Sequence, residues 1–287
     1  MATRSIFRRH PFLTTLVAVG TPTAVGLSLY FDRLARDYPA LPVPPSSPLT
    51  TLADASVRLG AQQLFVARVP LTPGLRRLAA LHDGSASTSK DDARSPNPTA
   101  LTTAFARSFL STPLFRLEAC FAGLVVDRSF TPGDLGESGF TPAQKLMHGL
   151  FVVVEPPHPL PRAEKDGGGE EGRLTLRWDL GRAPVAFFEM LARYGYGWRL
   201  MNGGRHVLEA AVVPSPGSSS AEEEVELRFG CTADYNRVGG VYGGDDGKEI
   251  PEWGKRIHEA YARALLDEGV RSLKRAAKQA EREALER

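Results

Sequence analysis

The sequence predicts an α+β domain in which a curved antiparallel sheet is covered by a long C-terminal helix. Residues 173–180 and 225–231 alternate apolar with polar side chains, which is the period of a half-buried strand. Residues 251–287 instead repeat apolar side chains every three or four positions, as an amphipathic helix does. Because a sheet with one apolar face must bury that face, the terminal helix is the expected cover, with an apolar cavity between helix and sheet.

The remaining elements of the domain follow from shorter patterns. Residues 100–126 are helix-like, and Pro113 divides them into two halves. Residues 148–155 are β-rich and are followed by two prolines, which predicts a strand that ends there. Residues 186–200 predict a short helix running into an aromatic loop, and residues 206–213 predict a further strand.

The N-terminus carries the pattern of a membrane anchor. An uncharged run, residues 11–31, follows a basic cluster, and no acidic residue occurs before Asp32. The cluster consists of Arg4, Arg8, Arg9 and His10. A spanning helix needs about 20 apolar residues, so we expect a single-pass anchor whose short N-terminus stays on the cytosolic or matrix side. A cleaved mitochondrial presequence and a secretory signal peptide are the alternatives, while a buried soluble helix is disfavoured because the run has no polar face.

Composition also narrows the cellular location. The N-terminal segment is rich in arginine and poor in acids, which favours a mitochondrial membrane over the endoplasmic reticulum. The chain has no permitted Asn-x-Ser/Thr glycosylation site, because Asn97 is followed by Pro98, and this disfavours a glycosylated lumenal protein. We therefore expect a single-pass membrane protein, mitochondrial rather than reticular.

These patterns divide the chain into three regions. Residues 1–38 form the basic segment and the transmembrane or targeting helix. Residues 39–98 form a proline-rich and polar linker with a helical stretch at 49–82, and residues 82–99 are rich in turn-forming side chains. Residues 99–287 form the folded domain.

Several functional classes are disfavoured by composition and spacing. A net charge of +2 with both signs interspersed lacks the basic stripe of a nucleic-acid binder, and two isolated cysteines make neither a zinc site nor a disulfide framework. Residues 243–248 share glycines with a phosphate loop, but Tyr242 and Glu249 stand where glycine and Ser or Thr are required. His258 lacks the second histidine of a zinc-protease helix, because position 262 is Ala262. We expect no metal and no cofactor, and the oligomeric state stays open.

Three segments of the chain resemble a known superfamily: 105–118 (FARSFLSTPLFRLE), 225–235 (VELRFGCTADY) and 258–273 (HEAYARALLDEGVRSL). They are similar to bacterial members of the START-like, or helix-grip, superfamily, in which a strand ending in Phe-Gly precedes a His-containing C-terminal helix. The whole chain, including its anchor and residues 198–206 (WRLMNGGRH), also resembles a group of fungal membrane-anchored proteins. The superfamily resemblance covers residues 99–287 and implies a helix-grip fold with a ligand cavity. It implies no catalytic residues, because the superfamily has no common set; many members bind lipids or other hydrophobic molecules, and some are enzymes.

The densest group of functional side chains lies in and around the predicted aromatic loop. Glycines there let the backbone turn sharply, and arginines between aromatic rings are suited to hold an anionic head group above an apolar pocket. Packing of a hairpin corner, with arginines stacked on rings, is the alternative. The candidate ligand-binding residues are Trp178, Phe188, Glu189, Tyr194, Trp198, Arg199, Arg205 and His206. His206 and Glu189 also form a candidate acid–base pair, although no catalytic residue is assigned.

Three functions remain open on this basis. We expect a membrane-tethered, non-catalytic binding protein for a hydrophobic or amphipathic, lipid-like small molecule. The first alternative is an enzyme that uses the same cavity, with His206, Glu189 and Arg199 as its polar groups. The second is a scaffold in which the C-terminal helix and residues 49–82 contact a membrane partner. A large apolar cavity favours binding, converging buried His and Glu favour catalysis, and a filled core with an exposed apolar helix face favours the scaffold.

Overall fold

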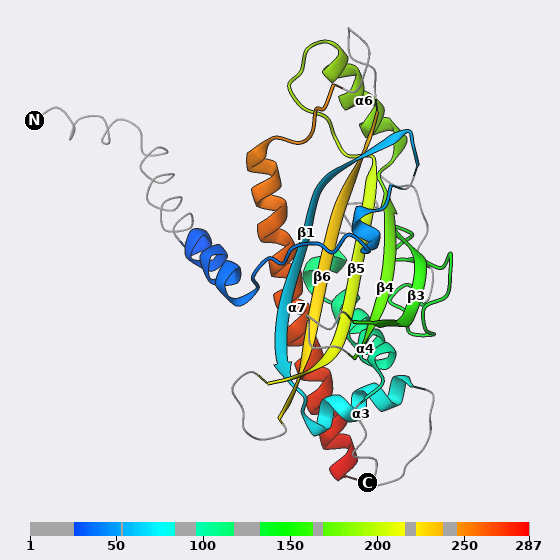
Figure 1. Cartoon of the computed structure of the whole chain (residues 1–287), viewed down its shortest axis with the longest axis vertical. Helices are drawn as coiled ribbons and strands as arrows, with labels where there is room; N and C mark the ends of the chain where they lie inside the picture. Colours follow the sequence, from blue (N-terminus) through cyan, green and yellow to red (C-terminus); the bar gives the residue numbers. More distant parts are fainter. Residues whose placement is uncertain are drawn as a thin grey trace, which may run out of the picture.

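The computed structural model describes residues 26–52, 54–83, 96–117, 133–162, 169–215, 222–237 and 246–286, and it is an α+β domain (Figure 1). A six-stranded antiparallel sheet has the order β1-β6-β5-β4-β3-β2, and its long C-terminal helix is α7. The elements are the 3-10 helix η1 (Pro48–Thr50), β1 (Val57–Pro70), α3 (Pro73–His82), α4 (Pro98–Leu110), β2 (Lys145–Leu146), β3 (Phe151–Pro161), β4 (Glu170–Asp179), α6 (Arg182–Arg193), β5 (Gly203–Pro214), β6 (Glu223–Asn236) and α7 (Glu252–Leu285). The predicted antiparallel sheet and long terminal helix are thus confirmed.

The first strand corrects the prediction for residues 49–82. We expected a helix there, but the structure forms β1 followed by the helix α3, joined by a turn at Thr72. The apolar run before Pro70 pairs with β6 along almost its whole length, and this ladder outweighs the weak helical pattern. Thr72 then caps α3, because its side chain accepts a hydrogen bond from the Leu75 N–H. The folded domain therefore begins well before residue 99, and much of the predicted linker belongs to it.

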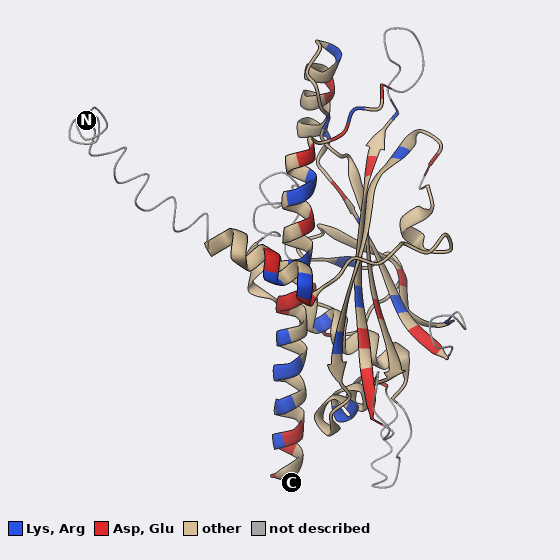
Figure 2. Ribbon diagram, turned by 60° about the vertical axis from the view of Figure 1, so that its left-hand side comes forward, with Lys and Arg blue, Asp and Glu red and all other residues tan. Residues whose placement is uncertain are grey.

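One face of the sheet, here called the inner face, packs against helices. The helix α4 lies across β3, β4 and β5, and Phe109 on α4 contacts Phe229 on β6 with their ring centroids 4.7 Å apart. The helix α7 contacts α3, α4 and the β1 side of the sheet, and Lys and Arg recur along its C-terminal half (Figure 2). We expected α7 itself to cover the sheet through Ile257, Tyr261 and Leu265. Leu265 is buried and Tyr261 packs half-buried against the core, but Ile257 is 60% exposed. The strands β3, β4 and β5 are covered by α4 instead.

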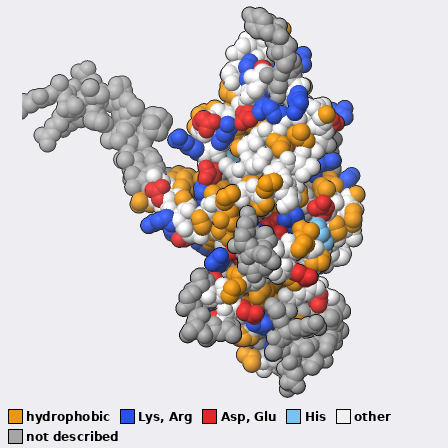
Figure 3. Space-filling model, viewed as in Figure 1, with side chains coloured by type: hydrophobic (Ala, Val, Ile, Leu, Met, Phe, Trp, Pro, Cys, Tyr) orange, Lys and Arg blue, Asp and Glu red, His pale blue; other side chains and the backbone are white. Residues whose placement is uncertain are grey.

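The opposite, outer face of the sheet is also covered, although the sequence predicted a solvent-facing side for 225–231. The proline-rich segment 39–52 first pairs with the edge strand, where the Leu41 N–H donates to the Leu64 carbonyl at 2.7 Å. It then crosses the outer face (Figure 1), where Leu49 is fully buried. Seen from the same side as a space-filling surface, the molecule mixes hydrophobic with charged side chains (Figure 3). Gly230 leaves room for this segment, because a Cβ there would lie 2.5 Å from Leu49 Cδ1. We call residues 39–52 the strap.

The segment leading into the strap is helical over 26–37 and is tied to α7. Tyr38 donates its hydroxyl to Asp267 Oδ1 at 2.7 Å, and Arg33 reaches Asp267 Oδ2 at 3.3 Å. Residues 11–25 of the predicted anchor lie outside the described residues. Among the residues that are described, no helix is both long enough and apolar enough to cross a membrane.

Two other predicted boundaries shift. The strand predicted at 148–155 is β3, which starts at Phe151 and continues through Pro156 and Pro157 to Pro161. Its pairing with β4 changes register on both sides of Glu155, which accommodates prolines that cannot donate to a ladder. Pro113 does divide the predicted helix: α4 ends at Leu110 and residues 113–117 form another helical turn, while 118–126 lie outside the described residues.

Candidate functional site

A row of polar side chains crosses the inner face near its middle. The strand registers place Gln63 of β1 opposite Cys231 of β6, and Cys231 opposite His206 of β5. His206 in turn lies opposite Leu176 of β4. Because residues directly opposite each other in a ladder point to the same side, all four side chains share the inner face. A polar row therefore lies under the helices in an otherwise apolar core.

His206 is enclosed by aromatic rings. Its ring centroid lies 5.2 Å from those of Phe151 and Phe229, 6.3 Å from that of Trp178 and 6.4 Å from that of Phe115. Burial, together with the nearby His258, lowers the pKa of His206 to about 3, so the imidazole is neutral at physiological pH. Its Nδ1 is buried and has no hydrogen-bond partner among the described residues.

A second unpaired nitrogen lies beside it. Trp178 Nε1 is buried and is likewise without a hydrogen-bond partner in the described part of the chain. The Trp178 ring covers Gly204, where a Cβ would come within 2.7 Å of the indole, so glycine is needed for the ring to lie there. Leaving a buried polar atom unpaired costs about 1–3 kcal/mol. Two such atoms on adjoining rings therefore mark a place where a polar group of another molecule would be stabilised.

The row reaches the surface near the first turns of α7. Gln63 Oε1 lies 3.3 Å from His258 Nδ1 and 3.5 Å from Cys231 Sγ, which links the sheet to α7. Burial lowers the pKa of His258 as well. A hollow of about 20 Å³ lies there, lined by Ala61, Gln63, Met201, Ala233, Tyr235, Ile250, Lys255 and His258. This hollow has room for one water molecule, so it is far smaller than the expected ligand cavity.

The predicted aromatic loop forms a separate corner at the α6 end of the sheet. Trp198 stacks on Phe188 of α6 with ring centroids 4.8 Å apart, and Tyr196 lies 5.0 Å from Trp198. An open hollow of about 630 Å³ adjoins Trp198 and is lined further by Gly197, residues 246–252 and Lys255. Arg199 is buried beneath it and pairs with Asp246 at 2.7 Å, while its Nε and Nη1 have no partner among the described residues. Burial opposes ionisation of Asp246, but the hydrogen bonds and positive charges of Arg199 and Lys248 together outweigh it and lower the Asp246 pKa.

The remaining predicted site residues lie elsewhere. Glu189 accepts a hydrogen bond from Asn236 Nδ2 at 2.6 Å, so the proposed pair with His206 is not formed. Tyr194 is 85% exposed just after α6. Arg205 points to the outer face, because neighbouring residues on a strand face opposite sides; it donates to the strap carbonyls of Pro48 and Thr51 and pairs with Asp234.

The eight predicted residues thus fall into separate places. Trp178 and His206 come together on the inner face, and Phe188, Trp198 and Arg199 form the corner. Nothing in the sequence indicated that Phe151 lies beside His206 or that Gln63 belongs to the same row two strands away, since strand register is invisible in one sequence. Cys231 and His258, which the sequence only excluded as zinc ligands, also belong to this row.

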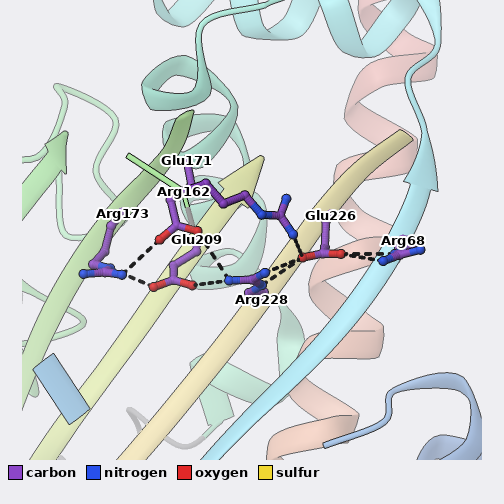
Figure 4. A network of polar contacts seen from close by, with 7 residues as sticks. All are labelled: Arg68, Arg162, Glu171, Arg173, Glu209, Glu226 and Arg228. Carbon is purple, nitrogen blue, oxygen red and sulfur yellow. Dashed lines mark hydrogen bonds and ion pairs between the residues drawn. The ribbon is translucent and has the colours of Figure 1, made fainter. Parts of the chain in front are cut away.

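The outer face holds a network of ion pairs rather than a free catalytic carboxylate (Figure 4). The network comprises Arg68, Arg162, Glu171, Arg173, Glu209, Glu226 and Arg228. Burial would raise the pKa of Glu226, but Arg228 and Arg162 hold it below its ordinary value. Burial and the neighbouring Glu209 instead raise the pKa of Glu171. Each carboxylate is paired with at least one guanidinium, as buried charges require.

Comparison with known proteins adds no assignment. The chain matches no protein-family model, no curated protein and no solved structure. Within the described ranges, no group of three or more His, Cys, Asp or Glu side chains is placed to hold a metal ion. The inner face and the corner are therefore the two places whose geometry bears on function.

Proposed function

We propose that this protein is a membrane-tethered, START-like helix-grip domain that binds a hydrophobic or amphipathic small molecule without catalysing a reaction. The order of elements supports the fold: a first strand, two helices, an antiparallel meander and a long terminal helix, with β1 paired to the last strand. The Phe-Gly pair that carries the resemblance also has a structural reason. Phe229 fills the inner core, while Gly230 admits the strap on the outer face.

The observation that carries the binding proposal is the pair of buried nitrogens on His206 and Trp178 that have no hydrogen-bond partner among the described residues. Trp178 Nε1 is a donor only, so the bound group must include a hydrogen-bond acceptor. The rings around His206 make the site poorly solvating, and an unpaired charge there would be costly. The preferred ligand is therefore an uncharged amphipathic molecule that presents a carbonyl, ester or hydroxyl group to the two rings and an apolar body to the core.

Entry of such a molecule requires a local rearrangement. The hollow beside Gln63 and His258 holds no more than a water molecule. We propose that the first turns of α7 separate from β1 and β6 to admit the ligand. These turns carry few apolar anchors, since Trp253 is 65% exposed and Ile257 is 60% exposed, so their separation from the sheet costs little burial.

The test is to isolate full-length protein in mild detergent and identify co-purifying small molecules by native mass spectrometry. His206→Phe keeps an aromatic ring but removes Nδ1, so ligand occupancy should fall by about tenfold, the cost of one lost hydrogen bond. The ligand-free protein should become no less stable, because an unpaired buried polar atom has been removed. His158→Phe is the matched control, because that half-buried histidine lies on β3 outside the aromatic enclosure. Absence of any bound molecule in the wild type, or equal occupancy in His206→Phe, contradicts the proposal.

A scaffold function is the second candidate, because the aromatic core is well filled and α7 begins with exposed Trp253 and Ile257. Under this alternative, the wild type forms a stable complex in native gels of solubilised membranes, and Trp253→Ser/Ile257→Ser should abolish it. The amount of small molecule bound to the protein should not affect this complex. The enzyme alternative relied on His206, Glu189 and Arg199, which occupy three separate places. No observation favours it.

A further inference from the structure

The outward face of α6 is unusual for a helix exposed to water. Its exposed positions are Arg182, Ala183, Ala186, Phe187, Met190 and Arg193, followed by Tyr194 directly after the helix. Phe187 is 52% exposed, Met190 45% and Tyr194 85%. These positions recur at helical spacing, so they form one continuous stripe, which we call the α6 stripe. The stripe lies at one end of the elongated sheet (Figure 1).

The α6 stripe is both apolar and basic. Arginines stand near its two ends, and no carboxylate occurs on it. Glu189, the only acid of α6, is half-buried at the edge of the stripe, one turn before Arg193, and its carboxylate accepts a hydrogen bond from Asn236. The helix is positioned by other residues, because Val185 and Ala192 are buried and Phe188 stacks on Trp198. The apolar side chains of the stripe are therefore not needed to fix α6 to the domain.

We propose that the α6 stripe is an interfacial contact with an anionic membrane surface. Phe187 and Met190 would enter the boundary between head groups and acyl chains, while Tyr194 would lie at head-group level with its hydroxyl in water. Arg182 and Arg193 would extend their charged ends to lipid phosphates and carboxylates. The absence of any acid on the stripe gives it the charge complementary to such a surface. This inference is independent of the ligand proposed for the inner face.

The experiment is hydrogen–deuterium exchange of full-length protein in nanodiscs made of phosphatidylcholine, with and without phosphatidylserine. Amides of 182–194 should exchange more slowly in anionic discs than in neutral discs or in detergent micelles. Arg182→Glu/Arg193→Glu should remove this protection, since each basic residue near an anionic surface contributes roughly fivefold in affinity. Phe187→Ser/Met190→Ser should weaken it in both kinds of disc. Amides of α3 serve as an internal reference, because that helix is also at the surface.

Matched controls separate this contact from other causes. Lys274→Glu/Arg275→Glu makes the same charge change at exposed positions near the far end of α7 and should leave α6 protection intact. Unchanged exchange of β5 and β6 in every variant shows that the domain stays folded. Equal exchange of 182–194 in anionic discs, neutral discs and detergent overturns the proposal. Protection that rises with protein concentration in detergent also overturns it, because that result identifies a second copy of the chain as the occupant.

Discussion

The two faces of the sheet exclude water by opposite means. The inner face packs Phe229 and Phe151 against helices, and His206 Nδ1 between their rings finds no hydrogen-bond partner in the part of the chain that the structure describes. The outer face buries charges instead, with Glu226 at 3% exposure and Arg228 at 9%, and every carboxylate of its network has a guanidinium partner. The carboxylates of the outer network are thus all paired, although Arg162 Nε and Nη1 have no partner among the described residues; on the inner face the unpaired group is a neutral ring. The two faces therefore bury different kinds of polar group: charges held by opposite charges on the outer face, and an uncharged imidazole among aromatic rings on the inner face.

The largest expected effect comes from the centre of the inner face. Phe229→Ala should lower the free energy of unfolding by roughly 3–5 kcal/mol, because it removes a fully buried ring and leaves a cavity against Phe109. Denaturant unfolding followed by circular dichroism measures the change. Leu285→Ala, at an 81% exposed position on the last turn of α7, is the control and should be nearly neutral. A loss below about 1 kcal/mol for Phe229→Ala would mean that the inner core is not packed as described.

Mutation of the outer-face ion-pair network should give the second-largest loss of unfolding free energy. Glu226→Gln keeps the shape of the side chain but removes the charge that faces Arg68, Arg162 and Arg228. We expect a loss of about 1.5–3 kcal/mol, the scale of hydrogen bonds to charged groups. Asp179→Asn breaks the half-exposed pair with Arg177 and should cost less than about 1 kcal/mol. Equal effects of the two substitutions would show that the network is solvated.

The histidine on the inner face predicts a pH dependence with a definite sign. Burial depresses the folded-state pKa of His206 to about 3, whereas the unfolded chain titrates near 6.5. The stability that the neutral ring contributes is present above about pH 6.5 and is lost as the pH falls toward 3, by about 1.4 kcal/mol per unit. His206→Phe should therefore flatten the fall in unfolding free energy between pH 7 and pH 5, measured by denaturant titration. If the unfolding free energy of His206→Phe falls with pH as steeply as that of the wild type and of His158→Phe, the His206 ring is exposed to water in the folded protein.

The smallest predicted effect concerns the strap. Ser47 caps the short helix η1 by accepting a hydrogen bond from the Leu49 N–H at 3.3 Å. Ser47→Ala should cost about 0.5–1 kcal/mol, the usual cost of a lost cap. The change should be local, so limited proteolysis of the folded protein should increase near residues 45–52 and not at α3. Unaltered cleavage would mean that the contacts of Leu49 and Arg205 hold the strap without the cap.

Periodic patterns predicted a large part of the fold. Alternation in β4 and β6 identified Leu176 and Phe229 as inner-face residues, and the helical period identified α7. The strand at 57–70 was missed, because its apolar run suits a helix as well as a strand until β6 is present to pair with it. The helix α4, not Ile257 of α7, covers most of the sheet, and amphipathic periods do not say which helix packs on which face.

The candidate site was predicted only in its parts. His206 and Trp178 were both singled out, but Phe151 beside His206 and Gln63 in the same row come from strands that lie far earlier in the sequence. Arg205 was grouped with His206 by proximity in sequence, yet consecutive residues of a strand point to opposite faces. Sequence spacing therefore located the strand that carries the site and not the set of side chains around it.

By itself the sequence determined the class of the domain, its long terminal helix and the two alternating strands, because hydrophobic periods of two and of 3.6 are local properties. Only the tertiary structure decided which polar residues are paired. The strap that buries Leu49 over Gly230, the ion pairs of Glu226 and the isolation of His206 Nδ1 all depend on strand register and on segments distant in sequence. Burial and hydrogen bonding are properties of contacts, and no single stretch of this chain contains Glu226 together with Arg68 and Arg162, or Leu49 together with Gly230.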